Sequence, residues 1–99
     1  MSLLVHYSLK DTAGHDGQAA AMTALVAGLK AEGIPGLHYA CYSTTDPLRF
    51  VGVMDFPDEA TKQAFLDSAA FAAYRATVGP TFANPPDTTE IFAVASTRG

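Results

Sequence analysis

Residues 48–74 read LRFVGVMDFPDEATKQAFLDSAAFAAY and decide the fold that we predict for this chain. Residues 48–56 are rich in apolar and β-forming side chains, which predicts a strand. A Pro-Asp turn follows, and Asp58 is a typical helix cap, so we expect a helix over residues 59–66. Ser68 is a second cap, which predicts a break in the helix and a further short helix over residues 69–77.

The strand at 48–56 is apolar on both of its faces. Phe50 and Met54 share one parity, and Val51 and Val53 share the other. A strand that is apolar on both faces is usually covered on both. We therefore expect helices on one face of the sheet and a partner sheet on the other.

The rest of the chain supplies a helix and three more strands. Met22, Leu25, Val26 and Leu29 form one stripe of a helix at 17–32, which Thr12 or Asp16 could cap and which Gly33 ends in a left-handed turn. In the helix expected over residues 59–66, we predict that Ala60, Ala64 and Phe65 or Leu66 point toward the core. Strands are predicted at 3–9, 37–44 and 88–95, with a proline-rich loop at 81–87.

The order of these elements is β-α-β-β-α-β, which is that of the ferredoxin-like split βαβ fold. We expect one α+β domain over residues 1–99, with an antiparallel four-stranded sheet. Right-handed crossovers place both helical segments on the same face of that sheet.

Composition indicates what kind of protein this is. The chain is 48% hydrophobic and only 16% charged, against about 25% charged in an average soluble protein. A homodimer through the bare sheet face would cover this excess of apolar residues.

The net charge of −4 argues against nucleic-acid binding. The sequence holds no apolar run long enough for a membrane span and no basic signal-peptide start, and its single cysteine, Cys41, fits a reducing compartment, so we expect a cytoplasmic protein.

Several short motifs resemble those of one family. They are Glu59-Ala60, Leu66, Ser68, Phe71 and Tyr74 at their spacings, Pro35-Gly36-Leu37-x-Tyr39, and the Asp46-Pro47 turn. Together they resemble the dimeric α+β barrel superfamily, and within it the antibiotic-biosynthesis-monooxygenase-like group. The resemblance covers nearly the whole chain.

The resemblance implies two stacked sheets, a small cavity in each protomer, and oxidation of a phenolic or quinol-like compound without metal or flavin. It also implies alternatives, because related branches degrade haem, cyclise polyketides or have no known activity. The chain departs from the family pattern at Phe65 and at Ala69-Ala70, where many members carry histidine, and it contains no tryptophan.

Three residues are candidates for catalysis. His6 is the candidate general base, because an imidazole transfers protons near neutral pH, and Tyr42 and Tyr74 are the candidate hydrogen-bond partners. The alternative is that His6 is a buried structural histidine and that Tyr42 belongs to a dimer interface. No cofactor is implied, and the three histidines share no metal-ligand spacing, with His15 expected on a loop.

An apolar pocket for a small aromatic ligand is the second prediction. Its expected walls are His38, Phe50, Met54, Phe65 and Phe71. The same side chains have an alternative interpretation as ordinary core, and which face of each strand lines the pocket stays open. A non-catalytic ligand-binding or stress-responsive dimer, and a lyase or cyclase, are the alternative functions.

Overall fold

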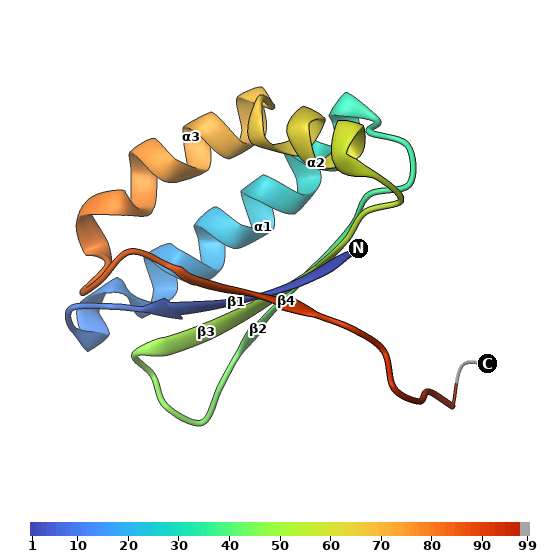
Figure 1. Ribbon diagram of the computed structural model, residues 1–99. Helices are drawn as coiled ribbons and strands as arrows, with labels where there is room; N and C mark the ends of the chain where they lie inside the picture. Colours follow the sequence, from blue (N-terminus) through green and yellow to red (C-terminus); the bar gives the residue numbers. More distant parts are fainter. Residues whose placement is uncertain (98–99) are drawn as a thin grey trace.

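The computed structural model describes residues 1–97 as a four-stranded sheet with helices packed on one face (Figure 1). The strands are β1 (Ser2–Ser8), β2 (His38–Ser43), β3 (Arg49–Asp55) and β4 (Asp87–Ile91). The helices are α1 (His15–Glu32), α2 (Glu59–Leu66) and α3 (Ala69–Val78), with 3₁₀ turns at Thr12–Gly14 and Gly79–Thr81.

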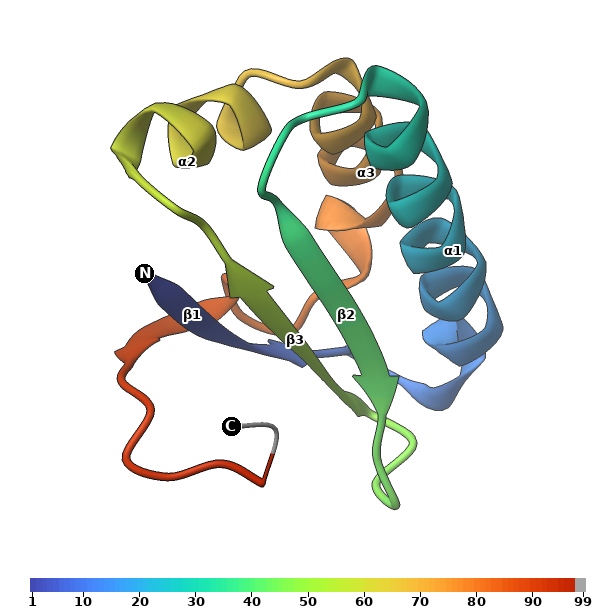
Figure 2. The same cartoon turned by 90° about the vertical axis from the view of Figure 1, so that its right-hand side faces the viewer.

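The sheet has the order β2-β3-β1-β4, and all its pairings are antiparallel. Figure 2 shows β2, β3 and β1 side by side, with α1 to the right of β2 and α3 above it. This arrangement confirms the predicted ferredoxin-like βαββαβ fold. None of the helices in residues 1–97 combines the length and apolar character that crossing a bilayer requires.

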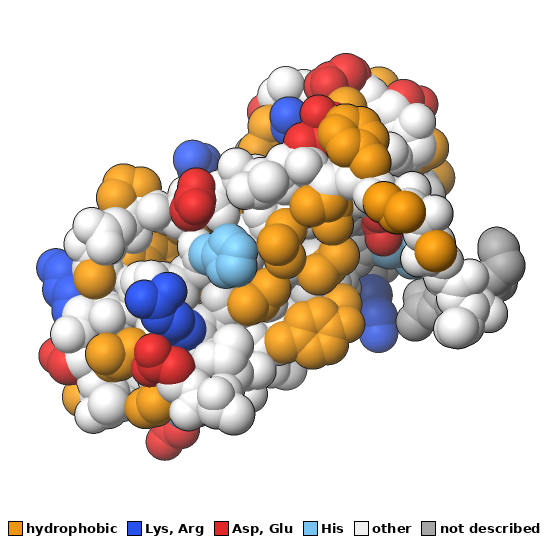
Figure 3. All heavy atoms as spheres, turned by 60° about the horizontal axis from the view of Figure 1, so that its bottom comes forward, with side chains coloured by type: hydrophobic (Ala, Val, Ile, Leu, Met, Phe, Trp, Pro, Cys, Tyr) orange, Lys and Arg blue, Asp and Glu red, His pale blue; other side chains and the backbone are white. Residues whose placement is uncertain are grey.

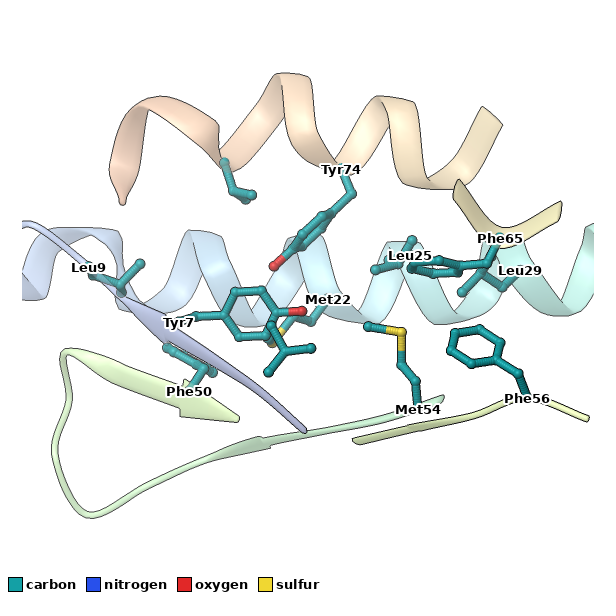
Figure 4. Packing of buried hydrophobic residues seen from close by; sticks show 12 residues of the cluster. Tyr7, Leu9, Met22, Leu25, Leu29, Phe50, Met54, Phe56, Phe65 and Tyr74 are labelled. Atoms are coloured by element: carbon teal, nitrogen blue, oxygen red, sulfur yellow. The ribbon is translucent and has the colours of Figure 1, made fainter. Parts of the chain in front are cut away.

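Strand parity divides the sheet into two unlike faces. On the inner face, Val5 and Tyr7 of β1 and Phe50 and Met54 of β3 are buried beneath the helices. Their neighbours Val51 and Val53 point to the opposite, outer face and are only half-buried. The core therefore lies between the sheet and α1 and α3, as Figure 4 shows in close-up.

Helix α1 carries the predicted apolar stripe and ends as expected. Gly33 takes the left-handed conformation with φ 65°, and its amide donates to the Leu29 and Lys30 carbonyls. The predicted caps are wrong, because the helix begins two residues earlier than expected. Gly14 is its N-cap, and neither Thr12 nor Asp16 caps it.

The predicted break between α2 and α3 is confirmed, and each of the two helices begins at a side-chain cap. The Asp58 carboxylate accepts from the Thr61 amide at 2.9 Å, and the Ser68 hydroxyl accepts from the Phe71 amide at 3.1 Å. The Glu32 carboxylate of α1 also accepts from the Ala69 and Ala70 amides at 3.3 and 3.1 Å. Helix α3 is thus held by its own cap and by the last turn of α1.

The inward face of α2 is narrower than predicted. Phe65 is buried, but Ala60, Ala64 and Leu66 are exposed. The reason is that α2 lies at the edge of the helical layer and contacts the core along one side only. Of the residues in its two turns, Phe65 is the one that is buried in the core.

The last strand is shorter than the predicted 88–95. It ends at Ile91, which pairs with Ser2, the first residue of β1. Beyond that point no strand remains to pair with, and Phe92 and Val94 are 77% and 100% exposed. The chain leaves the sheet there as a tail (Figure 1).

Candidate functional site

A cavity of about 650 Å³ lies between the sheet and the helices α2 and α3. This volume is within the range of roughly 300–1,000 Å³ that is usual for small-molecule sites. Its floor comes from the inner faces of β1 and β3, one wall comes from α2 and α3, and the remaining side is the loop between α3 and β4. The lining residues from the strands are Leu3, Val5, Tyr7, Met54, Phe56 and Thr88, and those from the helices are Lys62, Phe65, Leu66, Phe71, Tyr74 and Arg75.

Aromatic rings form most of the helical wall. The Phe65 and Phe71 rings lie 4.6 Å apart between centroids, and Phe71 stacks on Tyr74 at 6.5 Å. Across the cavity, Phe82 of the loop packs against Tyr7 at 5.7 Å. Flat walls of this kind favour a flat, apolar ligand.

The polar part of the site is a group of three tyrosines, the buried Tyr7 and Tyr74 and the half-buried Tyr39, which we call the tyrosine cluster. The Tyr7 and Tyr39 hydroxyls are hydrogen-bonded at 2.8 Å. Tyr74 meets Tyr7 edge to face, with the ring centroids 6.4 Å apart. Figure 4 shows the Tyr74 hydroxyl pointing from α3 toward the Tyr7 ring.

A glycine in β3 makes room for this cluster. A Cβ at Gly52 would lie 3.1 Å from the Tyr39 hydroxyl and 3.3 Å from that of Tyr7. Such a contact is closer than ordinary van der Waals packing. The absence of a side chain at this position therefore lets two phenol groups meet above the middle of the sheet.

Burial keeps these phenols protonated. It raises the pKa of Tyr39 and of Tyr74 far above the ordinary value of about 10, and the neighbouring Tyr7 adds to both shifts. Burial also raises the pKa of Tyr7, partly offset by its hydrogen bond with Tyr39. The cluster thus offers neutral O–H donors at neutral pH and no phenolate base.

Gln18 of α1 fixes the direction of the Tyr74 hydrogen bond. Its side chain is 1% exposed, and its Nε2 donates to the Tyr74 hydroxyl at 2.7 Å. Because the Tyr74 oxygen accepts this bond, its own proton is available to another acceptor. Among the described residues, the Gln18 Oε1 is buried without a hydrogen-bond partner.

Sequence reasoning missed Gln18 and Tyr7. Gln18 lies one helical turn before Met22 on the predicted apolar stripe, and a polar residue in that position is a signal for a buried hydrogen bond. Tyr7 shares the parity of the buried Val5 and Leu9, which was also readable from the sequence. Neither pattern identifies a site residue by itself, because Gln18 and Tyr7 come together with Tyr74 only when α3 packs against α1 and β1.

The structure divides the predicted site residues between the two faces of the sheet. Tyr74, Met54, Phe65 and Phe71 line the cavity. His6 and Tyr42 lie on the outer face, where both pair in register with Val51 across three adjacent strands. The structure therefore does not bring His6 and Tyr42 together with Tyr74, because the sheet separates them.

The remaining two predicted wall residues also lie outside the cavity lining. His38 has the parity of Tyr42 and is exposed on the outer face. Phe50 is buried on the inner face, but at the far end of β3, where its ring lies 5.0 Å from that of His15. His15 is not on a loop, as predicted, but is the first residue of α1.

Metal ligands do not gather anywhere in residues 1–97. No group of three or more histidine, cysteine, aspartate or glutamate side chains is placed to hold an ion there. Cys41 lies beside Tyr39 on the inner face, and burial raises the pKa of its thiol. A thiol in this state is a poor metal ligand and a poor nucleophile at neutral pH.

Solved structures share this fold over almost the whole chain. A protein from Caulobacter crescentus, named a "putative antibiotic biosynthesis monooxygenase", has a TM-score of 0.82 and 21% identity over 95% of this chain and 89% of its own. One from Nitrosomonas europaea with the same name has a TM-score of 0.79 and 18% identity over 96% and 100%. A second N. europaea protein, of unknown function, has a TM-score of 0.66 and 25% identity over 97% and 90%. No protein-family model and no curated protein matches the sequence.

Proposed function

We propose that this protein binds a small, flat phenol or quinol in the cavity and oxidises it with dioxygen, without a metal or flavin cofactor. The carrying observation is the buried Tyr74 hydroxyl, which accepts a hydrogen bond from Gln18 and therefore has its own proton to donate, to the neighbouring Tyr7 or to a ligand. The aromatic wall beside it suits a flat ring. The names of the proteins that share the fold support oxygenation as the class of reaction.

In this proposal the ligand ring lies between the strands β1 and β3 and the rings of Phe65 and Phe71. Its hydroxyl oxygen approaches Tyr74, which donates a hydrogen bond. Such a donor stabilises the substrate phenolate more than the neutral phenol, because bonds to charged acceptors are roughly twice as strong. The substrate proton leaves to water at the open side of the cavity.

The phenolate then supplies the electrons that reduce oxygen. For phenol itself, one molecule plus one O₂ gives 1,4-benzoquinone plus one water. The ring loses four electrons and two hydrogens, one oxygen atom enters the ring and the other leaves as water. The chain contributes orientation and the Tyr74 hydrogen bond, and no redox group of its own is required.

Oxygen uptake with a panel of phenols and hydroquinones tests this function. We expect uptake by the wild type, with one labelled atom from ¹⁸O₂ in the product and the other in water. Tyr74→Phe should lower kcat/KM by about tenfold to a hundredfold, the value of a hydrogen bond to a charged group. If the wild type consumes no oxygen with any compound of the panel, the proposed oxidation is refuted.

The same assay on the His6→Ala variant tests the general base that was predicted from the sequence. On the structure, His6 lies on the face of the sheet away from the cavity. We therefore expect uptake to persist in this variant. Loss of activity with an intact fold would return the proton transfer to His6 and contradict the role given to Tyr74.

Ligand binding without catalysis is the second candidate, and one observation favours it. Among the described residues that line the cavity there is no histidine, aspartate or glutamate to act as a general base. Calorimetric binding of the same phenols, with no oxygen consumed, would select this function. It would also show that the cavity is used while the chemistry is not.

We also propose a homodimer through the outer face of the sheet. Leu4, Val53 and Ala40 lie side by side at its centre, and Figure 3 shows the apolar side chains gathered there beside a histidine. A patch of this kind is commonly covered by a partner. Light scattering at micromolar concentration should give twice the monomer mass, and Val53→Glu should give a folded monomer. A monomeric wild type would contradict this assembly.

A further inference from the structure

We propose that the cavity selects an organic anion, a flat apolar ligand that carries a carboxylate, and that Lys62 and Arg75 bind this group at the rim. This inference deepens the proposed function and rests on it, because it names the class of ligand for the same cavity. It follows from the charges around the cavity, which differ from those of the chain as a whole.

The charge balance of the cavity is opposite to that of the protein. The chain has ten acidic and six basic residues. Among the residues that line the cavity, Lys62 and Arg75 are the two charged side chains, and no acid accompanies them. An acidic protein with a positively charged ligand site concentrates the attraction for an anion there.

Neither cation forms an ion pair within the described part of the fold. The ion pair found in residues 1–97 joins Arg49 to Asp46, at the turn between β2 and β3. Glu59, three residues before Lys62 on α2, and Glu90, on β4 beside Leu3, are both exposed and form no ion pair with the two cations. The charges of Lys62 and Arg75 are therefore free for a ligand.

Packing places both cations at the rim of the cavity, where their charged ends reach water. The Arg75 guanidinium lies 4.9 Å above the centre of the Phe71 ring, one turn back on α3, which is a cation–π contact. Lys62 is half-buried on α2, so its aliphatic stem covers apolar surface while its ammonium reaches water. An aromatic wall with two cations on its edge matches an aromatic carboxylate.

The two ends of the site then recognise different parts of the ligand. The apolar body lies against Phe65 and Phe71, and the carboxylate lies at the rim, where a guanidinium can bind it through two parallel hydrogen bonds. A neutral ligand of the same shape makes the first set of contacts only. The structure thus predicts a preference that depends on charge and not on shape.

Calorimetry with 2-naphthoate and 2-naphthamide tests this preference, because the two probes share a ring system and differ in charge. We expect the wild type to bind 2-naphthoate about five- to tenfold more tightly than the amide. Lys62→Gln and Arg75→Gln should each weaken 2-naphthoate about threefold or more and change the amide less than twofold. Lys30→Gln, which removes an exposed cation of the last turn of α1 that does not line the cavity, is the matched control and should change neither.

The dependence of binding on salt concentration is an independent test of the anion preference. Raising the ionic strength from 0.05 to 0.5 M should weaken 2-naphthoate binding by the wild type and leave the double variant of Lys62 and Arg75 nearly unaffected. Equal binding of both probes by the wild type would overturn the anion preference while leaving the aromatic cavity of the proposed function intact. Failure of both probes to bind would overturn both. An unchanged preference in Lys62→Gln and Arg75→Gln would place the anion elsewhere and contradict the assignment.

Discussion

The hydrogen bond between Gln18 and Tyr74 can be removed from either side, and the two removals should differ sharply. Tyr74→Phe deletes one hydroxyl without changing the shape of the ring. It leaves the Gln18 amide, which is 1% exposed, with no hydrogen-bond partner among the described residues. A buried polar group that loses its partner costs about 1–3 kcal/mol. We expect Tyr74→Phe to lower the free energy of unfolding by that amount.

Gln18→Met replaces the amide by an apolar side chain of similar length. It removes the unpartnered Oε1 together with the donor, and the Tyr74 hydroxyl that it leaves behind still lies against Tyr7, so its cost should be about 1 kcal/mol or less. The double variant has no polar group left at this contact and should resemble Gln18→Met. The two substitutions are therefore not additive, and the expected coupling is about 1–2 kcal/mol.

Urea unfolding followed by circular dichroism measures all three variants. For a domain of this size, a change of 1 kcal/mol corresponds to a shift of about 4–8 °C in Tm. Gln63→Met, on the exposed side of α2, is the control for the same change of side chain and should have little effect, because it removes only a solvent-exposed hydrogen bond to Asp67. Additivity within about 0.3 kcal/mol would refute the direct coupling of Gln18 to Tyr74.

Three further predictions concern the fold and the site. Gly28→Ala would place a Cβ 2.8 Å from that of Ala70, so we expect thermal unfolding to show destabilisation by about 1–3 kcal/mol, whereas Gly17→Ala, in the same helix with nothing within 4 Å, should be neutral or stabilising. The Asp58 carboxylate accepts from the Thr61 amide and hydroxyl, which lowers its pKa, so its contribution is present above pH 3.8 and is lost as the pH falls through the lowered value. Acid titration should therefore show Asp58→Ala less stable than the wild type at pH 7, with the gap closing toward pH 3; a constant gap would contradict this. The pKa values of the tyrosine cluster are raised by burial, so its contribution is complete below pH 10 and is lost above it, and the absorbance of ionised tyrosine at pH 11 should stay below that of the unfolded chain until the protein unfolds.

Local chemistry explains which elements were predictable. Asp58, Ser68 and Gly33 act within one helical turn of their own positions, and each takes the role that its side chain or its freedom of φ indicates. The parity of β3 was readable because alternate side chains must point to opposite faces. The order of the elements then left one fold as the natural prediction.

The errors arise where a residue depends on a distant partner. Residues 92–95 have the composition of a strand, but β1 begins at Ser2 and offers them nothing to pair with. Parity groups His6 with Val51 and Tyr42, but cannot say which face of the sheet the helices will cover. The sequence therefore predicted the cavity's helical wall, from Phe65 to Tyr74, better than its floor.

The separate caps of α2 and α3 have a consequence for how this fold varies. Helix α3 is fixed at its start by Ser68, whose hydroxyl also donates to the Phe65 carbonyl of α2, and by the Glu32 carboxylate of α1, a contact that does not involve α2. Lengthening or shortening α2 at its first turn would thus reshape one wall of the cavity while the Glu32 contact keeps the start of α3, and with it Tyr74, in place. The hydrogen-bonding part of the cavity, Tyr74, lies on α3, whereas the wall that can change lies on the short helix α2. Insertions or deletions in α2 can therefore fit the cavity to new ligand shapes.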